Sequence, residues 1–221
     1  MFISRRMTKK PVVARSDYTC VEALRLMKAE NVDKLPVLSS RGELVGVITE
    51  KDILRAHCET SERKISLLEQ AFEVSTMTID RIMSRDVVSC RPDTSIEEVS
   101  RIMVTMDLSF LPVTDEDGRL VGLVSKSDMF KILMELSGAR HYGTRISFTV
   151  VDKIGTIANI SKVLSDNNIS IIAFCTYLDP DPSKVICSLK VEGADEAFLV
   201  KLLSPFVADF VDLGERRNEK T

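Results

Sequence analysis

Apolar and polar residues follow one pattern twice within the first 132 residues of the chain. Residues 2–56 align with residues 78–132 at a constant offset of 76, without a gap, and 17 of these 55 positions are identical. The identities form clusters, such as Leu-Pro-Val and Leu-Val-Gly in both copies, followed by Asp52 and Asp128. Identities that cluster at one fixed offset predict a duplicated structural unit.

Each copy is expected to fold in the order β-α-β-β-α. A short strand at Val12–Val13 or Val87–Val88 leads to a helix that begins near Asp17 or Asp93. The helix is predicted because apolar residues recur at i, i+3 and i+7, as on one buried face. These residues are Cys20, Ala23 and Met27 in the first copy and Ile96, Val99 and Met103 in the second.

The middle of each copy is expected to be a β-hairpin. Pro36 and Pro112 lie in its first strand, which should be an edge strand or hold its proline at one end, because proline cannot donate a hydrogen bond to a ladder. Gly42 and Gly118 can supply the positive φ of the turn between the strands.

The second strand of each hairpin, at 44–48 or 120–124, is apolar throughout, so we expect it to be buried on both faces. A helix follows from Glu50 or Lys126. The two α+β units should pack together as a pair, because each sheet alone leaves an apolar face uncovered. Between them, apolar residues at helical spacing predict an amphipathic connecting helix, with Ile65, Leu68, Ala71 and Phe72 on one face.

The pattern changes after the second copy. Strands are predicted at 146–151, 169–178, 184–191 and 206–213, and helices at 156–164 and 195–203. This βαββαβ order is that of ferredoxin-like domains. The expected segments are a first copy at 1–56, a connecting helix at 57–77, a second copy at 78–136, a linker at 137–144, a C-terminal domain at 145–213 and a polar tail at 214–221.

Composition excludes several classes of protein. The chain is 44% hydrophobic and carries a net charge of −3, so a folded core is expected and binding to nucleic acid or to an anionic membrane is disfavoured. Neither a secretory signal nor a membrane span is apparent, so a cytoplasmic location is expected. The five cysteines form no CxxC pair, and His57 beside Cys58 has no further ligands near it, so we expect free thiols and no metal site.

The second strand of each copy runs into a motif of Gly, two apolar residues, Thr or Ser, two variable residues and Asp, at 46–52 and 122–128. With Leu-Pro-Val upstream, both copies resemble the CBS domain family over about 55 residues each. The resemblance implies a pair of CBS units, also called a Bateman module, with an adenosyl ligand in the cleft. The hydroxyl residue would contact phosphate or ribose, and the aspartate would bind the ribose hydroxyls. These residues are Thr49 with Asp52 and Ser125 with Asp128.

Physical chemistry supports this role and also offers an alternative. A hydroxyl at a strand-to-helix junction lies at the positive end of the helix dipole, where an anionic phosphate is favoured. The same Thr-x-x-Asp and Ser-x-x-Asp patterns form capping boxes, however, which stabilise a helix by about 1 kcal/mol without any ligand. Both interpretations stay open at this point.

Other cleft residues follow from the same resemblance. Lys34 and Phe110, which precede Leu-Pro-Val, would face the cleft, where Lys34 can meet a phosphate and Phe110 can stack on a base. A solvated lysine and a core phenylalanine are the alternatives. The residues expected to border the adenine are Val12, Val13, Val87 and Val88.

The C-terminal segment resembles the ACT domain, a regulatory fold that often binds amino acids at subunit interfaces. The resemblance rests on Asp152, Gly155 and Asn168, which are its candidate ligand residues. Ile154 replaces the proline of the usual Asp-x-Pro-Gly turn, so a dimerisation domain is the alternative. The stretch at 179–182 is interpreted as a loop rather than a cation site.

The order CBS, CBS, ACT resembles the acetoin-utilisation AcuB-type proteins. This resemblance implies a regulatory homodimer that senses AMP, ADP, ATP or S-adenosylmethionine and modulates an unidentified protein target, in acetoin or central carbon metabolism. The alternatives are a ligand-free oligomerisation scaffold and an amino-acid-responsive regulator acting through the ACT domain. An enzyme is disfavoured, and no catalytic cofactor is expected, because the chain has two histidines, His57 and His141, and neither a nucleophile elbow nor a Walker loop.

Overall fold

The computed structural model of the chain describes residues 1–61 and 75–214. It divides into two compact units, Met1–Met129 (unit 1) and Phe130–Thr221 (unit 2). Most of the predicted connecting helix, with Ile65, Leu68, Ala71 and Phe72, and the tail beyond Gly214 lie outside the described residues.

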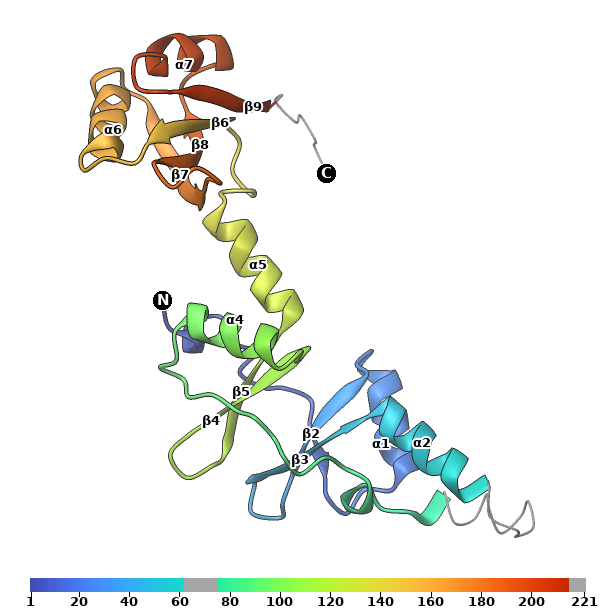
Figure 1. Cartoon of the computed structure of the whole chain (residues 1–221). Helices are drawn as coiled ribbons and strands as arrows, with labels where there is room; N and C mark the ends of the chain where they lie inside the picture. The colour runs from blue at the N-terminus through green and yellow to red at the C-terminus, as the bar shows by residue number, and fades with distance from the viewer. Residues whose placement is uncertain (62–74, 215–221) are drawn as a thin grey trace. The chain divides into compact units, whose positions relative to one another are not determined.

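The two copies of the repeat are successive along the chain (Figure 1). The first comprises a 3-10 turn η1 (Ile3–Arg5), β1 (Ala14–Arg15), α1 (Cys20–Ala29), β2 (Lys34–Leu38), β3 (Leu44–Thr49) and α2 (Glu50–Ser61). The second comprises η2 (Ile79–Arg81), α4 (Ile96–Thr105), β4 (Phe110–Thr114), β5 (Leu120–Ser125) and α5 (Lys126–Leu136). The predicted β-α-β-β-α order is confirmed in the first copy, and the second copy lacks a regular first strand.

Local hydrogen bonding sets the start of the first helix of each copy. Helix α1 begins at Cys20, three residues after the predicted start near Asp17, because the Thr19 hydroxyl accepts the Glu22 N–H and the Glu22 carboxylate accepts the Thr19 N–H. Asp17 instead forms a 2.7 Å ion pair with Arg15. Helix α4 is capped in the same position by Ser95, whose hydroxyl accepts the N–H of residue 98.

The predicted first strands are displaced. Strand β1 is Ala14–Arg15 rather than Val12–Val13, and it pairs in parallel with Val37 and Leu38 of β2. In the second copy no strand forms at Val87–Val88, and the equivalent contact is a single parallel bridge between Cys90 and Val113. A strand forms in this region only where residues pair with a neighbouring strand. The two apolar dipeptides form no such pairs.

The expected position of the prolines was wrong for the first sheet. Its strand order is β1-β2-β3, so β2 is central, and Pro36 is the third of its five residues. The proline is tolerated because β1 is short and pairs only with residues 37 and 38, beyond the proline. The hairpin turns were predicted correctly, with φ of +81° at Gly42 and +76° at Gly118.

Each copy is completed by residues near the start of the other copy. Thr8 forms an antiparallel bridge with Leu123 of the second copy, and Ser84 forms the equivalent bridge with Val47 of the first. Both bridges carry hydrogen bonds in both directions, with N–O distances of 2.9 to 3.0 Å. Unit 1 is therefore held together by a reciprocal exchange between its halves.

Two glycines allow this exchange. A Cβ at Gly46 would lie 2.5 Å from Sδ of Met83, and a Cβ at Gly122 would meet the side chain of Met7. Strands β3 and β5 are accordingly buried at their glycines and only half-buried on the opposite face, for example at Val47. The prediction that these strands are buried on both faces was therefore wrong for one face.

Unit 2 has the predicted βαββαβ order. It comprises β6 (Thr144–Val151), α6 (Thr156–Asp166), β7 (Ser170–Leu178), β8 (Lys184–Glu192), α7 (Glu196–Leu203) and β9 (Asp209–Gly214). All neighbouring strands are antiparallel, in the order β7-β8-β6-β9. The last strand starts at Asp209 rather than at the predicted Phe206, which packs at the edge of the core instead.

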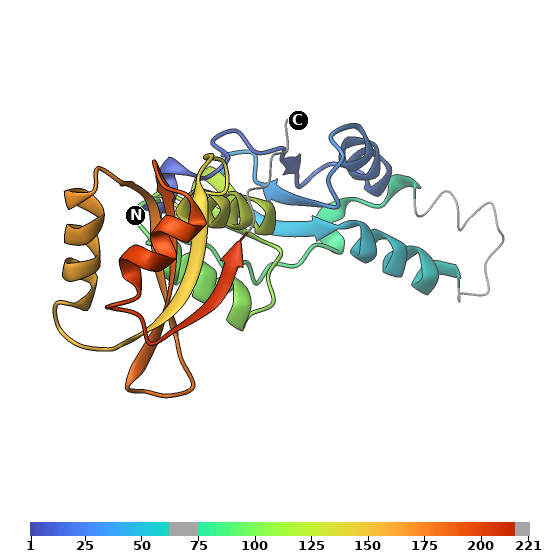
Figure 2. The ribbon, with the colours of Figure 1, turned by 90° about the horizontal axis from the view of Figure 1, so that it is seen from above.

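Helices α6 and α7 cover one face of this sheet (Figure 1, Figure 2). Ile160 of α6 and Leu199 of α7 are fully buried against Phe148 and Leu189 of the strands. Thus unit 2 has a core of its own, separate from the core of the first repeat around Leu35. Among the described helices, none is long and apolar enough to cross a membrane.

Candidate functional site

A cavity of about 920 Å³ lies within unit 1, between the two repeats. The first repeat lines it with the second half of α1, the loop that follows, the start of β2 and the start of α2. The second repeat lines it with residues at the start of β4, the end of β5 and the start of α5. The lining residues are Leu24, Met27, Lys28, Asn31, Val32, Asp33, Lys34, Glu50, Ser109, Phe110, Leu123, Ser125, Lys126 and Ser127.

The two Ser/Thr–Asp motifs form matching capping boxes. In the first, Oδ2 of Asp52 accepts the Thr49 hydroxyl at 2.7 Å and the Thr49 N–H at 2.9 Å, while the Asp52 N–H donates to the Thr49 hydroxyl. In the second, Oδ2 of Asp128 accepts the Ser125 hydroxyl at 2.7 Å and the Ser125 N–H at 3.0 Å. The capping interpretation is therefore confirmed for both motifs, and in each the other carboxylate oxygen is not part of the box.

The boxes also place a hydroxyl at the N-terminus of a helix. Ser125 lines the cavity and immediately precedes α5, so its hydroxyl lies where the helix dipole favours negative charge. Asp128 is 9% exposed, one turn into the same helix. The geometry therefore satisfies the cap and places the second motif at the cavity wall at the same time.

The cavity brings together three of the ten predicted ligand residues, Lys34, Phe110 and Ser125. Lys34 is half-buried and its ammonium group donates to the Ser109 hydroxyl, which joins the first repeat to the second. Phe110 stands at the start of β4, opposite Ser125 of β5. The seven predicted residues that do not line this cavity are Val12, Val13, Thr49, Asp52, Val87, Val88 and Asp128.

Sequence reasoning missed the contribution of helix α1 to the cavity. Leu24, Met27 and Lys28 have the spacing i, i+3 and i+4, so they share one helix face, and Asn31 follows in the loop after α1. This spacing was a usable signal, but Met27 also belongs to the apolar stripe that packs on the sheet, and Leu24 and Lys28 lie beside that stripe. Until the second repeat packs against the first, nothing in the pattern distinguishes a helix face that lines a cavity from one that is exposed to solvent.

The family model of the CBS domain matches residues 3–59 and 79–135, which together make up more than half of the chain. The chain belongs to the CBS domain family. The two matches coincide with the two copies of the repeat, so the cavity lies between two CBS domains. The tandem CBS pair predicted from the sequence is confirmed.

Two curated relatives each match about three fifths of this chain. An uncharacterized protein, MJ1426, from Methanocaldococcus jannaschii is 24% identical over 155 residues, which are 61% of this chain and 92% of that protein. The L-aspartate semialdehyde sulfurtransferase of the same organism is 29% identical over 126 residues, which are 57% of this chain but 22% of the enzyme. The matched part is about a fifth of that enzyme. The match therefore does not indicate a catalytic activity for this chain.

Solved structures show the same fold for the CBS part. The CBS domain pair of protein MJ0100, in complex with 5′-methylthioadenosine and S-adenosyl-L-methionine, is 28% identical with a TM-score of 0.50, and the match covers 64% of this chain and 98% of that one. A Vibrio cholerae protein named as an acetoin utilization protein (AcuB) is 24% identical with a TM-score of 0.53, covering 63% of this chain and 95% of that one. At that identity the likeness to AcuB shows the fold alone.

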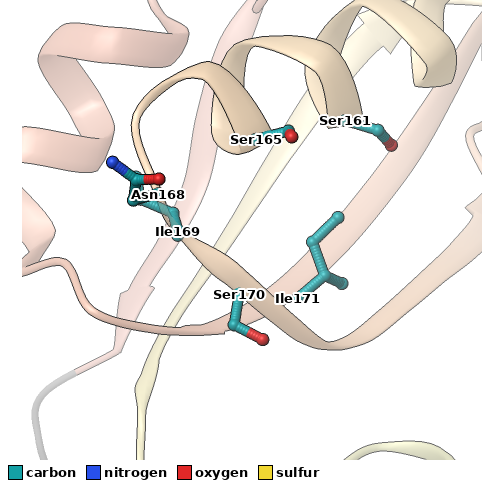
Figure 3. A pocket seen from close by; sticks show the side chains of 6 residues that line it. All are labelled: Ser161, Ser165, Asn168, Ile169, Ser170 and Ile171. Atoms are coloured by element: carbon teal, nitrogen blue, oxygen red, sulfur yellow. The ribbon is translucent and has the colours of Figure 1, made fainter.

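Unit 2 contains a second, shallower cavity of about 430 Å³. Figure 3 shows Ser161 and Ser165 on α6 above the turn at Asn168 and the first residues of β7. Asn168 lines the cavity and has a φ of +55°, whereas the other candidate ACT residues, Asp152 and Gly155, do not line it. The CBS matches end at residue 135, so the ACT assignment of unit 2 stays a prediction.

Proposed function

We propose that this chain is a regulatory protein that binds an adenine nucleotide or S-adenosylmethionine in the cavity between its CBS domains and modulates a protein partner. The observation that carries the proposal is the position of the second motif, which sets the Ser125 hydroxyl and the α5 N-terminus in the wall of a cavity shared by both repeats. A volume of about 920 Å³ is within the range of small-molecule sites.

Residues of the proposed site have complementary chemistry. Phe110 offers an aromatic face to a base, Lys34 offers an ammonium group to a phosphate, and Ser125 offers a hydroxyl to phosphate or ribose. Asp128, and Asp52 in the first motif, would accept ribose hydroxyls through their carboxylates. The adenosyl ligands bound by the MJ0100 CBS pair support this class of ligand.

The quaternary structure and the biological setting are further proposals. We expect a homodimer, with a helix-free sheet face in unit 2 as one contact, because such a face gains by pairing with a second copy. We expect no catalytic activity, and relatives named as enzymes match this chain over a small part of their length. A role in acetoin or central carbon metabolism stays a prediction.

Calorimetric titration of the full-length chain with AMP, ADP, ATP and S-adenosylmethionine tests the proposal. At least one of these ligands should bind, and Asp128→Ala should weaken binding by about 1 to 3 kcal/mol, because hydrogen bonds to a charged group are lost. The substitution also removes a helix cap, which costs about 0.5 to 2 kcal/mol of stability.

Glu22→Ala is the matched control for that loss of stability. Glu22 closes the capping box of α1 with Thr19 and does not line the cavity, so its removal should lower stability by a similar amount and leave ligand affinity unchanged. If no adenosyl ligand binds, or if both variants bind as the unaltered chain does, the motifs are caps only. If no ligand binds at all, the chain is better described as a ligand-free oligomerisation scaffold, which the complete capping boxes would equally permit.

A further inference from the structure

Helix α5 belongs to both units of the chain. It runs from Lys126 to Leu136, and the boundary between the two units falls inside it, after Met129. Its first turn is closed by the capping box of Ser125 and Asp128, and the hydroxyl residue of that box lines the cavity of the CBS pair. The start of this helix is therefore part of the candidate ligand site, and its end is part of unit 2.

The end of α5 is a Schellman motif that is fastened to the sheet of unit 2. The N–H of Ala139 donates to the carbonyl of Met134, and Gly138 has the positive φ, +63°, that this motif requires. The ammonium group of Lys190 on β8 donates to the Gly138 carbonyl at 2.9 Å, close to the helix end where the dipole favours a positive charge. Unit 2 therefore helps to cap a helix whose N-terminal cap lies in unit 1.

Two glycines let the segment after α5 lie directly against strands β7 and β8. A Cβ at Gly138 would lie 2.8 Å from Cγ2 of Ile172 on β7. A Cβ at Gly143 would meet the carbonyl oxygen of Val191 on β8. Since no larger residue fits at either position without a shift, the segment is packed against the sheet along its length.

The middle of α5 is largely exposed. Among its eleven residues only Asp128 and Ile132 are buried. Four of its apolar side chains are exposed, those of Phe130, Leu133, Met134 and Leu136. Helix formation is cooperative, and isolated helices shorter than about 12 to 15 residues are marginal in water. The helix therefore depends on what holds its two ends, and a contact that stabilises one end also stabilises the other.

We propose that α5 couples the CBS cavity to unit 2. A ligand that binds Ser125 and Asp128 stabilises the first turn of α5, and helix cooperativity passes this stabilisation to the last turn and its attachment to Lys190. Without ligand the last turn opens more often. The sheet ladders persist in both states, because β8 pairs with β6 and β7 and not with α5. This proposal rests on the proposed function and adds the route by which the ligand acts on unit 2.

Two cysteines of unit 2 report on this attachment. Cys175 on β7 is half-buried, and its thiol donates to the carbonyl of Leu136 in the last turn of α5, with 3.7 Å between Sγ and the oxygen. Opening of that turn uncovers the thiol without unfolding the sheet. Cys187 on β8 is fully buried in the core of unit 2, so a reagent reaches it only when unit 2 unfolds. Cys187 is therefore the internal reference for Cys175.

Labelling of the full-length chain with N-ethylmaleimide at pH 8, read by peptide mass spectrometry, tests the coupling first without ligand. Asp128→Ala removes the N-terminal cap of α5, so it should speed the labelling of Cys175 at least about threefold and leave Cys187 unchanged. Glu22→Ala opens the capping box of α1, which does not enter unit 2, and is the matched control. It should leave the labelling of both cysteines unchanged.

The second arm adds saturating ADP, with its binding measured by calorimetry on the same sample. ADP should slow the labelling of Cys175 at least about threefold and leave Cys187 unchanged. Lys190→Met removes the attachment of the last turn, so in this variant ADP should still bind but no longer change the labelling of Cys175. The same measurement with AMP, ATP and S-adenosylmethionine covers the other ligands of the proposed function.

An unchanged rate at Cys175 while a ligand saturates the cavity would overturn the coupling and leave the proposed function standing. Equal acceleration of Cys175 by Glu22→Ala and Asp128→Ala, or acceleration of Cys187 together with Cys175, would also overturn it, because the opening is then not confined to α5. A ligand effect that persists in Lys190→Met would contradict the route through this attachment. If none of the adenosyl compounds binds, the proposed function fails and this inference fails with it.

Discussion

Gly122→Ala tests the reciprocal packing that holds the CBS pair together. A Cβ at residue 122 would lie 3.0 Å from Cγ and 3.1 Å from Cε of Met7, and Met7 supplies the three nearest atoms. Carbon atoms in contact prefer separations of about 3.5 to 4.0 Å, so the Met7 side chain must move. We expect the free energy of unfolding of unit 1 to fall by about 1 to 3 kcal/mol, as overpacked sites do. The melting temperature should fall by about 2 to 4 °C for each kcal/mol.

A double-mutant cycle identifies the cause. In a Met7→Ala background the added methyl group has room, so Gly122→Ala should cost less than it does alone, with a coupling energy of about 1 kcal/mol or more in urea unfolding. Gly118→Ala is the control, because Gly118 has a φ of +76° and no atom would lie within 4 Å of its Cβ. Its cost comes from the backbone and should add to that of Met7→Ala. Additive costs for Gly122→Ala and Met7→Ala would refute the proposed contact.

Three further outcomes are expected. Burial raises the pKa of Cys90 and of Cys187 to about 11, so at pH 8 a thiol reagent should label the half-buried Cys175 faster than either, as peptide mass spectrometry can show. The same raised pKa values mean that the neutral thiols stabilise the fold below the ordinary thiol pKa of 9.0 and that this contribution is lost as the pH rises toward 11, so thermal melts should move to lower temperature over that interval. Ile160→Ala should cost unit 2 about 2 to 5 kcal/mol in denaturant unfolding, because Ile160 is fully buried, and should leave the unfolding of unit 1 unchanged.

Periodicity predicted the elements whose partners are local. Ala23 and Met27 share one helix face, and the structure buries both, because helical spacing alone decides which side chains can meet the sheet. The hairpin turns followed from Gly42 and Gly118 for an equally local reason, namely the need for a positive φ.

Predictions that depended on distant partners were less accurate. Val12 and Val13 are good strand residues, yet the strand forms at Ala14 because residues 37 and 38 are available only there. Pro36 is tolerated in a central strand for the same reason, since β1 begins opposite Val37, beyond the proline. Strand pairing depends on residues that are distant in the sequence. The pattern within one segment therefore does not predict it.

The candidate site shows the same division. The Ser/Thr–Asp motifs were found from the sequence because a capping box spans only four residues. The α1 wall of the cavity was missed because it exists only where the second domain packs against the first. Lys28 and Asn31 are exposed residues, and only the packing of the second domain makes them part of a cavity wall.

Hydrogen–deuterium exchange of the full-length chain, with and without saturating ADP, tests the central claim most directly, because it locates the ligand by residue. We predict slower exchange at residues 24–34 and 123–127, the two walls of the CBS cavity, and unchanged exchange in the sheet of unit 2. Slower exchange confined to residues 161–171, around the cavity of unit 2, or no change anywhere in the chain, would contradict the assignment of ligand binding to the CBS pair.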